Sequence, residues 1–417
     1  MEDQPVGRRV AYLRTRRRMS QQVFADRLGK SKSWVDKVER GVRRLDKFSI
    51  IAEIAKVLQV DVAVLMDGGA SQESRPAGTR GVKRVDVAEI RAVLERYDKI
   101  STCYEPAPSA MPLSELRKAV DHAWMSFQHA NYAGLAKTLP KLIRDGQAAD
   151  GSGEGDTARS GAYLLAEVYQ ITSSTLRKLG EHDLAWIAAD RATMVCQRAG
   201  DELLAALATE QVAAALSALG RVRSALEISV SVAHQLAPRD DHDETPQRMS
   251  VYGMVLLRGA LAAARLGDAY TVRELLAAAD AAAKEVGADE NFYWTSFGPT
   301  NVALYQVAAE VELGEAARAL RTSDGIDPSG YAAMLPERRA SHMLNLARAY
   351  TQVGNLPRAG ETLVEADRLA PNEVRCRPEA QELVVELVRR TGGPPAPGML
   401  EIVDQMGLSA AAAASRS

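Results

Sequence analysis

Apolar residues recur at helical spacing along most of the chain, and polar residues cover the opposite side of each predicted helix. Ala, Leu, Glu and Arg dominate these segments. No segment alternates apolar and polar residues with the Val, Ile, Thr and Tyr content that is typical of strands. The pattern therefore predicts an all-α protein.

Glycine, serine and proline interrupt this periodicity and suggest domain boundaries. We predict an N-terminal domain over residues 1–66, followed by a flexible linker over residues 67–84 that is rich in Gly, Ser and Pro. A helix is expected from about Val85 to Tyr97. Further breaks are expected around Pro106 to Pro112, from Asp145 to Gly161 and over residues 392–397. The alanine-rich residues 409–417 should be frayed.

Helical hairpins recur in the C-terminal part, each with a Leu-Gly or Val-Gly pair at the predicted turn. The pairs are spaced by 40, 47, 47 and 40 residues and are Leu179-Gly180, Leu219-Gly220, Leu266-Gly267, Leu313-Gly314 and Val353-Gly354. The last unit, Ala340 to Pro371, resembles a tetratricopeptide repeat at these positions: Ala347, Tyr350, Gly354, Ala359, Ala366 and Pro371. We predict connecting helices and a degenerate first repeat over 85–160, a repeat superhelix over 161–392 and a tail over 393–417. An irregular alanine-rich helical bundle is the alternative.

The segment from Gln21 to Glu39 carries residue types that suit two crossing helices. Ala25 is small where the helices would cross, and Gly29 suits the left-handed backbone of a turn. Ser20 and Ser31 are placed to cap the second and third helices. A small five-helix core is expected from inward-facing Leu13, Phe24, Leu28, Val35, Val38, Ile51, Ile54 and Leu58.

At these residues the segment resembles the Cro and phage-repressor (XRE) helix-turn-helix family over about 60 residues. The resemblance implies a recognition helix from Ser31 to Glu39 in the DNA major groove, with phosphate contacts just beyond it. The implied DNA-binding residues are Gln21, Ser31, Lys32, Ser33, Trp34, Lys37, Arg40, Arg43 and Arg44. Trp34 either packs on DNA or tucks against a neighbouring helix. Solvated charges on a domain that no longer binds DNA are the alternative.

Charge is distributed unevenly along the chain. Residues 1–65 hold 15 Lys and Arg against 8 Asp and Glu, whereas the whole chain has a net charge of −2. A balance of +7 on the first domain leaves −9 for the remainder. This asymmetry is typical of a protein in which one small module meets phosphate.

Polar residues recur on the predicted inner wall of the repeats, which the first helix of each hairpin would form. Glu167 and Glu210 lie there. Candidate ligand-binding residues are Gln170, Gln211, Arg258, Trp294, Asn301, Tyr305, Asn345 and Arg348. Amide side chains suit an extended peptide backbone, and an arginine suits a carboxylate. A merely solvated inner wall is the alternative.

The segment Asn291 to Asn301 gathers aromatic residues and a Gly-Pro pair in an otherwise alanine-rich region. Together with the basic domain, the linker and the repeats, it resembles actinobacterial helix-turn-helix regulators with tetratricopeptide-like C-terminal domains. The architecture is more distantly similar to peptide-pheromone-sensing regulators of Gram-positive bacteria. That similarity implies binding of a short peptide in the repeats and dimerisation through them.

Enzymatic and metal-binding functions are disfavoured. The chain lacks a Gly-rich phosphate loop and a serine elbow, and its six His and three Cys lack metal-ligand spacing, so we expect no enzyme activity, cofactor or metal. No apolar run is long enough to span a membrane, and we expect a cytoplasmic protein. The sequence predicts a transcriptional regulator that binds an operator in duplex DNA as a homodimer and senses a peptide or small molecule. A constitutive dimeric regulator and a protein-interaction scaffold are the alternatives.

Overall fold

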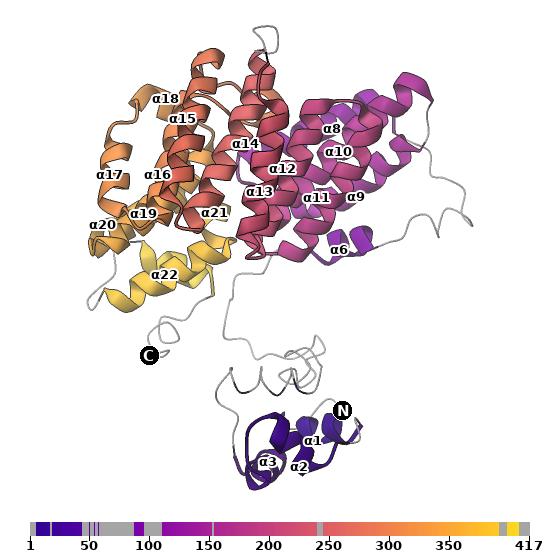
Figure 1. Ribbon diagram of the computed structural model, residues 1–417, viewed down its shortest axis with the longest axis vertical. Coiled ribbons are helices and arrows are strands. Elements are labelled where there is room, and N and C mark those ends of the chain that lie inside the picture. Colours follow the sequence, from indigo (N-terminus) through magenta and orange to yellow (C-terminus); the bar gives the residue numbers. More distant parts are fainter. Residues whose placement is uncertain are drawn as a thin grey trace. The chain divides into compact units, whose positions relative to one another are not determined.

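The computed structural model describes residues 6–16, 19–43, 50, 54, 57, 87–95, 111–151, 154–239, 245–391 and 398–407 (Figure 1). The chain divides into two compact units, residues 1–78 and 79–417. The described residues form helices and short turns, with one isolated bridge between Glu290 and Phe297. The all-α prediction is confirmed. None of the described helices is both long and apolar enough to cross a lipid bilayer.

The first unit contains α1 (Val6–Arg16), α2 (Gln21–Arg27) and α3 (Lys32–Glu39). The hydroxyl of Ser20 accepts a hydrogen bond from the Val23 amide at 3.2 Å, and that of Ser31 accepts one from the Trp34 amide at 3.1 Å. Both predicted caps are therefore formed. Gly29, at φ +60°, makes the left-handed turn between α2 and α3.

A small core holds these three helices together. Its fully buried members include the predicted Phe24, Ala25, Val35 and Ile54. The predicted core positions Leu13, Ile51 and Leu58 lie outside the described side chains, as do the bounds of the expected fourth and fifth helices. The predicted linker, residues 67–84, also lies outside the described residues.

Antiparallel helical hairpins build the second unit, and each predicted Leu-Gly or Val-Gly pair lies at a hairpin turn (Figure 1). The first helices are α10 (Gly155–Lys178), α12 (Glu202–Ala218), α14 (Pro246–Arg265), α16 (Pro299–Glu312) and α19 (Pro336–Gln352). Their partners are α11 (His182–Ala199), α13 (Val222–Leu236), α15 (Ala269–Val286), α17 (Ala316–Asp324) and α20 (Leu356–Leu369). The five turn glycines have φ between 75° and 82°. Glycine adopts this backbone conformation without steric cost, which explains the recurring pair.

The degenerate first repeat is a hairpin of α8 (Leu113–Gln128) and α9 (Tyr132–Asp150). Ala130 occupies the position of the turn glycine at φ 56°, so the hairpin forms without the sequence signature of the others. The expected helix from Val85 to Tyr97 is described as α6 (Ala88–Glu95). Its apolar face, with Ile90 and Leu94, packs into the same core as α8 and α9.

The break predicted from Asp145 to Gly161 is wrong over most of its length. Helix α9 continues to Asp150 and α10 already begins at Gly155. The glycines in this segment permit close packing of the two helices. A Cβ on Gly161 would lie 2.6 Å from the Ala149 carbonyl oxygen, and one on Gly146 would lie 3.0 Å from Leu165 Cδ1. The glycines that suggested a loop in the sequence instead allow α9 and α10 to pack closely.

The region around the last hairpin contains η1 (Phe292–Trp294), α18 (Pro328–Ala333), α21 (Pro371–Arg375), α22 (Pro378–Arg390) and α23 (Met399–Gln405). The sequence predicts a C-terminal tail over residues 393–417. Within it, α23 buries Met399, Ile402 and Val403 in the apolar core that it shares with α20. Residues 408–417 lie outside the described part of the chain.

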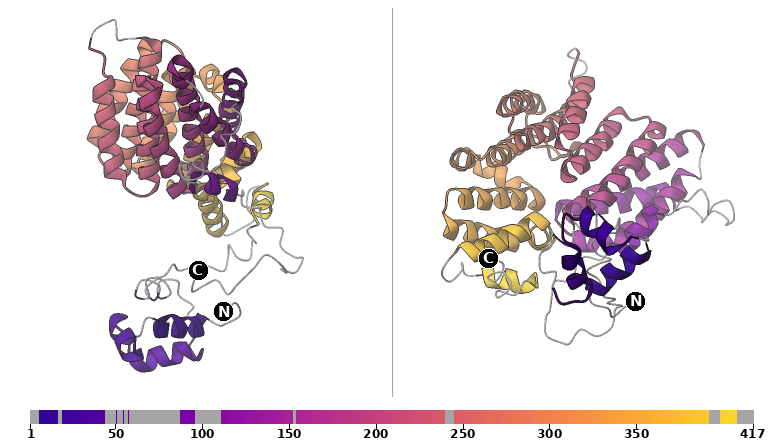
Figure 2. Two further views of the ribbon diagram at one scale, coloured as in Figure 1. Left: turned by 90° about the vertical axis from the view of Figure 1, so that its right-hand side faces the viewer. Right: turned by 60° about the horizontal axis from the view of Figure 1, so that its bottom comes forward.

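The repeat array curves until its last helices meet its first (Figure 2). Ala340 of α19 and Ala370 belong to the same apolar core as α6, α8, α9 and α10. Lys178 of α10 also forms ion pairs with Glu337 of α19 and with Glu373 of α21, both at 2.5 Å. The repeat array is therefore closed into a ring, and its inner wall surrounds a pocket.

Candidate functional site

The predicted DNA-binding face lies on the exposed side of α3. Lys32, Ser33 and Lys37 are all exposed and share one side of the helix, whereas Val35 and Val38 are buried in the core. Lys32 and Lys37 form no ion pair with another described residue. Their ammonium groups are therefore available to an external acceptor.

A buried ion pair orients the start of α2 beside this face. Glu39, at the end of α3, accepts hydrogen bonds from Arg14 Nε at 2.6 Å and from Gln21 Nε2 at 2.8 Å. Arg14 also donates to the Met19 carbonyl oxygen. The network ties all three helices together and fixes the amide of Gln21, a predicted DNA contact.

The remaining predicted DNA contacts have different surroundings. Ser31 is exposed and its hydroxyl caps α3. Trp34 packs against the core and has the Arg43 guanidinium 6.0 Å from its ring centre, so the structure places it against the domain. Arg40 forms an exposed ion pair with Asp36 at 3.3 Å. Arg44 lies outside the described residues.

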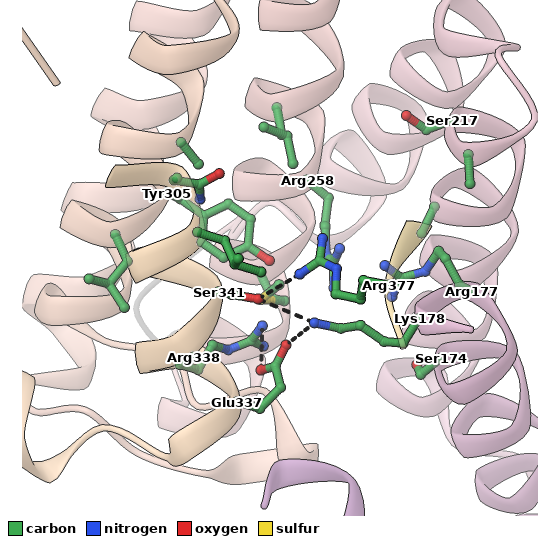
Figure 3. A pocket seen from close by; sticks show the side chains of 18 of the residues that line it. Ser174, Arg177, Lys178, Ser217, Arg258, Tyr305, Glu337, Arg338, Ser341 and Arg377 are labelled. Atoms are coloured by element: carbon green, nitrogen blue, oxygen red, sulfur yellow. Dashed lines mark hydrogen bonds and ion pairs between the residues drawn. The ribbon is translucent and has the colours of Figure 1, made fainter. Parts of the chain in front are cut away.

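A pocket of about 480 Å³ lies on the inner wall of the ring (Figure 3). The first helices of successive hairpins line it, together with α22 and the segment around Trp294. Its volume falls within the range of about 300–1,000 Å³ that is typical of ligand sites. All eight predicted ligand-binding residues line it: Gln170, Gln211, Arg258, Trp294, Asn301, Tyr305, Asn345 and Arg348.

The polar groups among these eight residues differ in how far the protein already satisfies them. Gln170 donates to the Leu204 carbonyl oxygen at 3.2 Å, and Gln211 accepts from Ser174 at 3.0 Å. Asn301, by contrast, is fully buried and neither atom of its amide group has a hydrogen-bond partner in the described structure. Asn345 likewise bonds no other described residue through its amide group.

The charged residues of the wall are paired to different degrees. Arg258 meets Glu210 at 3.0 Å and lies over the Tyr305 ring, with its Cζ 5.8 Å from the ring centre. Arg348 meets Glu312 at 3.0 Å. Sequence reasoning missed other lining cations, namely Arg177, Lys178, Arg265, Arg338 and Arg377. Arg177 was detectable, because it follows Gln170 by seven residues and so lies on the same helix face.

A buried charge network forms one side of the pocket, where the ring closes. Glu373 accepts hydrogen bonds from Lys178 and from Arg377 at 2.5 and 2.8 Å, and also from the Tyr132 hydroxyl. Burial by itself raises the pKa of Glu373, but the charges of Lys178 and Arg377 outweigh it and keep the pKa below its usual value. Burial lowers the pKa of Lys178 and raises that of Tyr132.

The aromatic segment singled out in the sequence crosses to the first repeat. Gln128 and Asn291 exchange hydrogen bonds through their amides at 2.9 and 3.2 Å. The Trp294 ring stacks on Trp124 with centres 5.9 Å apart, and its indole nitrogen donates to Glu167 at 3.0 Å. Tyr293, Trp294 and Ser296 all have φ between 50° and 61°. Such conformations are costly for these residue types, and these contacts hold the segment in place.

Comparisons with known proteins bear on the two units differently. No curated protein matches the chain. PlcR of Bacillus thuringiensis, solved in complex with the peptide PapR7 and DNA, aligns over 88% of this chain and 99% of its own at 12% identity. The TM-score of that alignment is 0.33, too low to establish a shared fold. Residues 5–66 match the family model of a helix-turn-helix domain, with the caps, turn glycine and buried crossing alanine described above. The N-terminal unit therefore contains a helix-turn-helix domain.

Proposed function

We propose that this protein is a sequence-specific transcription regulator in which α3 contacts base edges of an operator and the central pocket binds a ligand. The observation that carries the DNA-binding part is the exposed, unpaired side of α3, with Lys32, Ser33 and Lys37 in register behind the Ser31 cap. Lysine donates to guanine acceptors, and serine bonds either base type. We expect Arg40, Arg43 and Arg44, which follow the helix in the sequence, to contact backbone phosphates.

Selection of bound genomic fragments identifies the operator, and variants then test the face. Replacing both Lys32 and Lys37 with Ala should cost about 1–3 kcal/mol per lost contact and relax the sequence preference there. Arg43→Ala should instead weaken all sequences alike and reduce the salt dependence. Lys137→Ala, an exposed lysine of α9, is the control. Full operator affinity in the double variant would contradict the assignment.

We infer that the working form is a homodimer on a two-fold symmetric operator. One helix-turn-helix domain buries little DNA surface, and tight specific binding by this class uses two half-sites. The repeat unit is the proposed source of the dimer contacts. Light scattering on the full chain at micromolar concentration decides this, and a monomer would contradict it.

We infer further that the ligand is a short peptide and that it changes the arrangement of the two DNA-binding domains. Asn301 and Asn345 present amides that bond no other described side chain or backbone, and an amide can both donate to and accept from a peptide backbone. A coupling of about 1–3 kcal/mol changes operator affinity roughly 5–150-fold.

Operator binding with and without culture-extract fractions tests the coupling. Replacing Asn301 and Asn345 together with Ala should abolish the response while leaving ligand-free DNA binding intact. If no extract fraction changes the melting temperature or operator affinity of the wild type, the repeats serve only to dimerise.

A further inference from the structure

The centre of the pocket carries more positive than negative charge. We call Arg177, Lys178, Arg258, Arg338 and Arg377 the central cations; Figure 3 shows them converging from α10, α14, α19 and the α22 side. Their buried partners are three acids, Glu210, Glu337 and Glu373. The central group is therefore left with two positive charges in excess.

Other acids that line the pocket do not remove this excess. Glu312 is shared between Arg348 at 3.0 Å and Arg265 at 3.8 Å. Glu379 is 61% exposed, and Glu382 and Glu386 are exposed on α22, where water screens their charge. The net charge of the groups that line the centre of the pocket, away from screening water, is therefore positive.

Arg177 is the central cation without an acidic partner. It is half-buried on the last turn of α10, and no described acid lies within ion-pair distance. Its Nε is buried and has no hydrogen-bond partner in the described structure. Burial, and next the charge of Arg258, lower the pKa of Arg177 to about 10, so the group stays charged at neutral pH. A partly buried cation with no acidic partner is less favourable than one that pairs with an anion.

Asn301 is an independent sign that the pocket is built for a ligand. It lies in the first turn of α16, lines the same pocket and is 0% exposed. Both atoms of its amide lack a hydrogen-bond partner. Buried amides are nearly always satisfied in folded proteins, so two unpaired amide atoms in a pocket that also contains an unpaired cation indicate a missing polar partner.

We propose that the pocket binds its ligand through an oxyanion, a carboxylate or a phosphate, which pairs with Arg177 among the central cations. The proposal rests on the ligand-binding part of the proposed function and names the chemistry that this pocket selects. Guanidinium groups bind either oxyanion with paired, charge-assisted hydrogen bonds. Asn301 would bond a neighbouring amide or hydroxyl of the same ligand.

Thermal unfolding of the full chain at constant ionic strength, followed by tryptophan fluorescence, tests this with three probes. They are a random tetrapeptide pool with free carboxyl termini, the same pool amidated, and inorganic phosphate, each against chloride. A larger stabilisation by the free-carboxyl pool identifies a carboxylate ligand, and a larger one by phosphate identifies a phosphate ligand. The proposal is overturned if none of the three probes stabilises the wild type more than chloride does. It is also overturned if the amidated pool stabilises the protein as much as the free-carboxyl pool and phosphate does not stabilise it.

The variant Arg177→Gln separates binding from structure. It should weaken binding of the effective anion about 30-fold or more. Without any probe it should unfold at the same or a higher temperature than wild type, because the unpaired charge is gone. Arg198→Gln, which removes an exposed arginine paired with Asp150 at 2.6 Å, is the control and should bind within about twofold of wild type. An unchanged anion response in Arg177→Gln, or a clear loss of stability without probe, would overturn the proposal.

These measurements use no DNA. Anion binding without any change in operator affinity would leave the oxyanion site in place and overturn ligand-dependent regulation. If operator binding responds to an extract fraction but no anion binds, ligand-dependent regulation stands and the oxyanion site is overturned.

Discussion

Closure of the ring by Lys178 is open to a direct test of stability. Lys178 is 7% exposed and bonds Glu337 and Glu373, which are 5% and 0% exposed. Lys178→Met keeps the volume of the side chain but removes the charge and leaves both carboxylates without this partner. Removing one member of a buried ion pair costs about 3–5 kcal/mol, because the remaining charge stays buried. The variant should therefore lose about 3–5 kcal/mol of unfolding free energy.

Lys141→Met is the matched control. Lys141 makes an ion pair of nearly the same length, 2.6 Å, with Asp145 one helical turn away, but is 66% exposed. Exposed pairs at this spacing contribute about 0.3–0.5 kcal/mol. Urea unfolding of the full chain, followed by tryptophan fluorescence, measures both variants, since Trp124 and Trp294 lie at the ring's inner wall.

A double-mutant cycle isolates the pair itself. Glu373→Gln removes one of the two carboxylates that lose their lysine partner in Lys178→Met, so the double variant should lose about 1–3 kcal/mol less than the sum of the single losses. Two outcomes would refute the reasoning: a cost for Lys178→Met no larger than for Lys141→Met, or additive effects in the cycle.

Two further predictions concern the pH dependence of stability and the turn between α8 and α9. Burial lowers the pKa of His342 from 6.5 to about 4, so the unfolded chain takes up a proton first as the pH falls. Between pH 7 and 4 the unfolding free energy of the wild type should therefore fall by about 3 kcal/mol more than that of His342→Asn. Urea unfolding at several pH values measures both, and equal losses would contradict the prediction. Ala130 has a left-handed backbone at φ 56°, so Ala130→Gly should raise the unfolding free energy by up to about 1 kcal/mol. The control, Ala119→Gly inside α8, should lower it by about 1 kcal/mol. Thermal unfolding compares the two variants, and destabilisation by Ala130→Gly would show that Ala130 is not strained.

Local signals in the sequence predicted the helix-turn-helix motif and the repeat hairpins well. Ser20, Gly29 and Ser31 act within a few residues of their own position, through capping and backbone conformation, so spacing alone identified their roles. The same holds for the turn glycines, such as Gly180 and Gly354. Failures arose where composition was ambiguous. Gly146 and Gly161 suggested a loop, but they serve the close crossing of α9 and α10.

The sequence by itself determined the helices, their turns and the faces that point inward, because each depends on a periodicity of three to four residues. It placed Gln170, Arg258 and Asn301 on one inner wall, and the structure brings them to one pocket. Only the tertiary structure decided that the array closes into a ring. Closure depends on contacts such as that between Lys178 and Glu373, 195 residues apart, and small changes of angle at each hairpin accumulate before those residues meet. For the same reason no local pattern revealed which cation would be left without a partner: Arg177 resembles its neighbours in sequence, and only the positions of all the acids around it leave it unpaired.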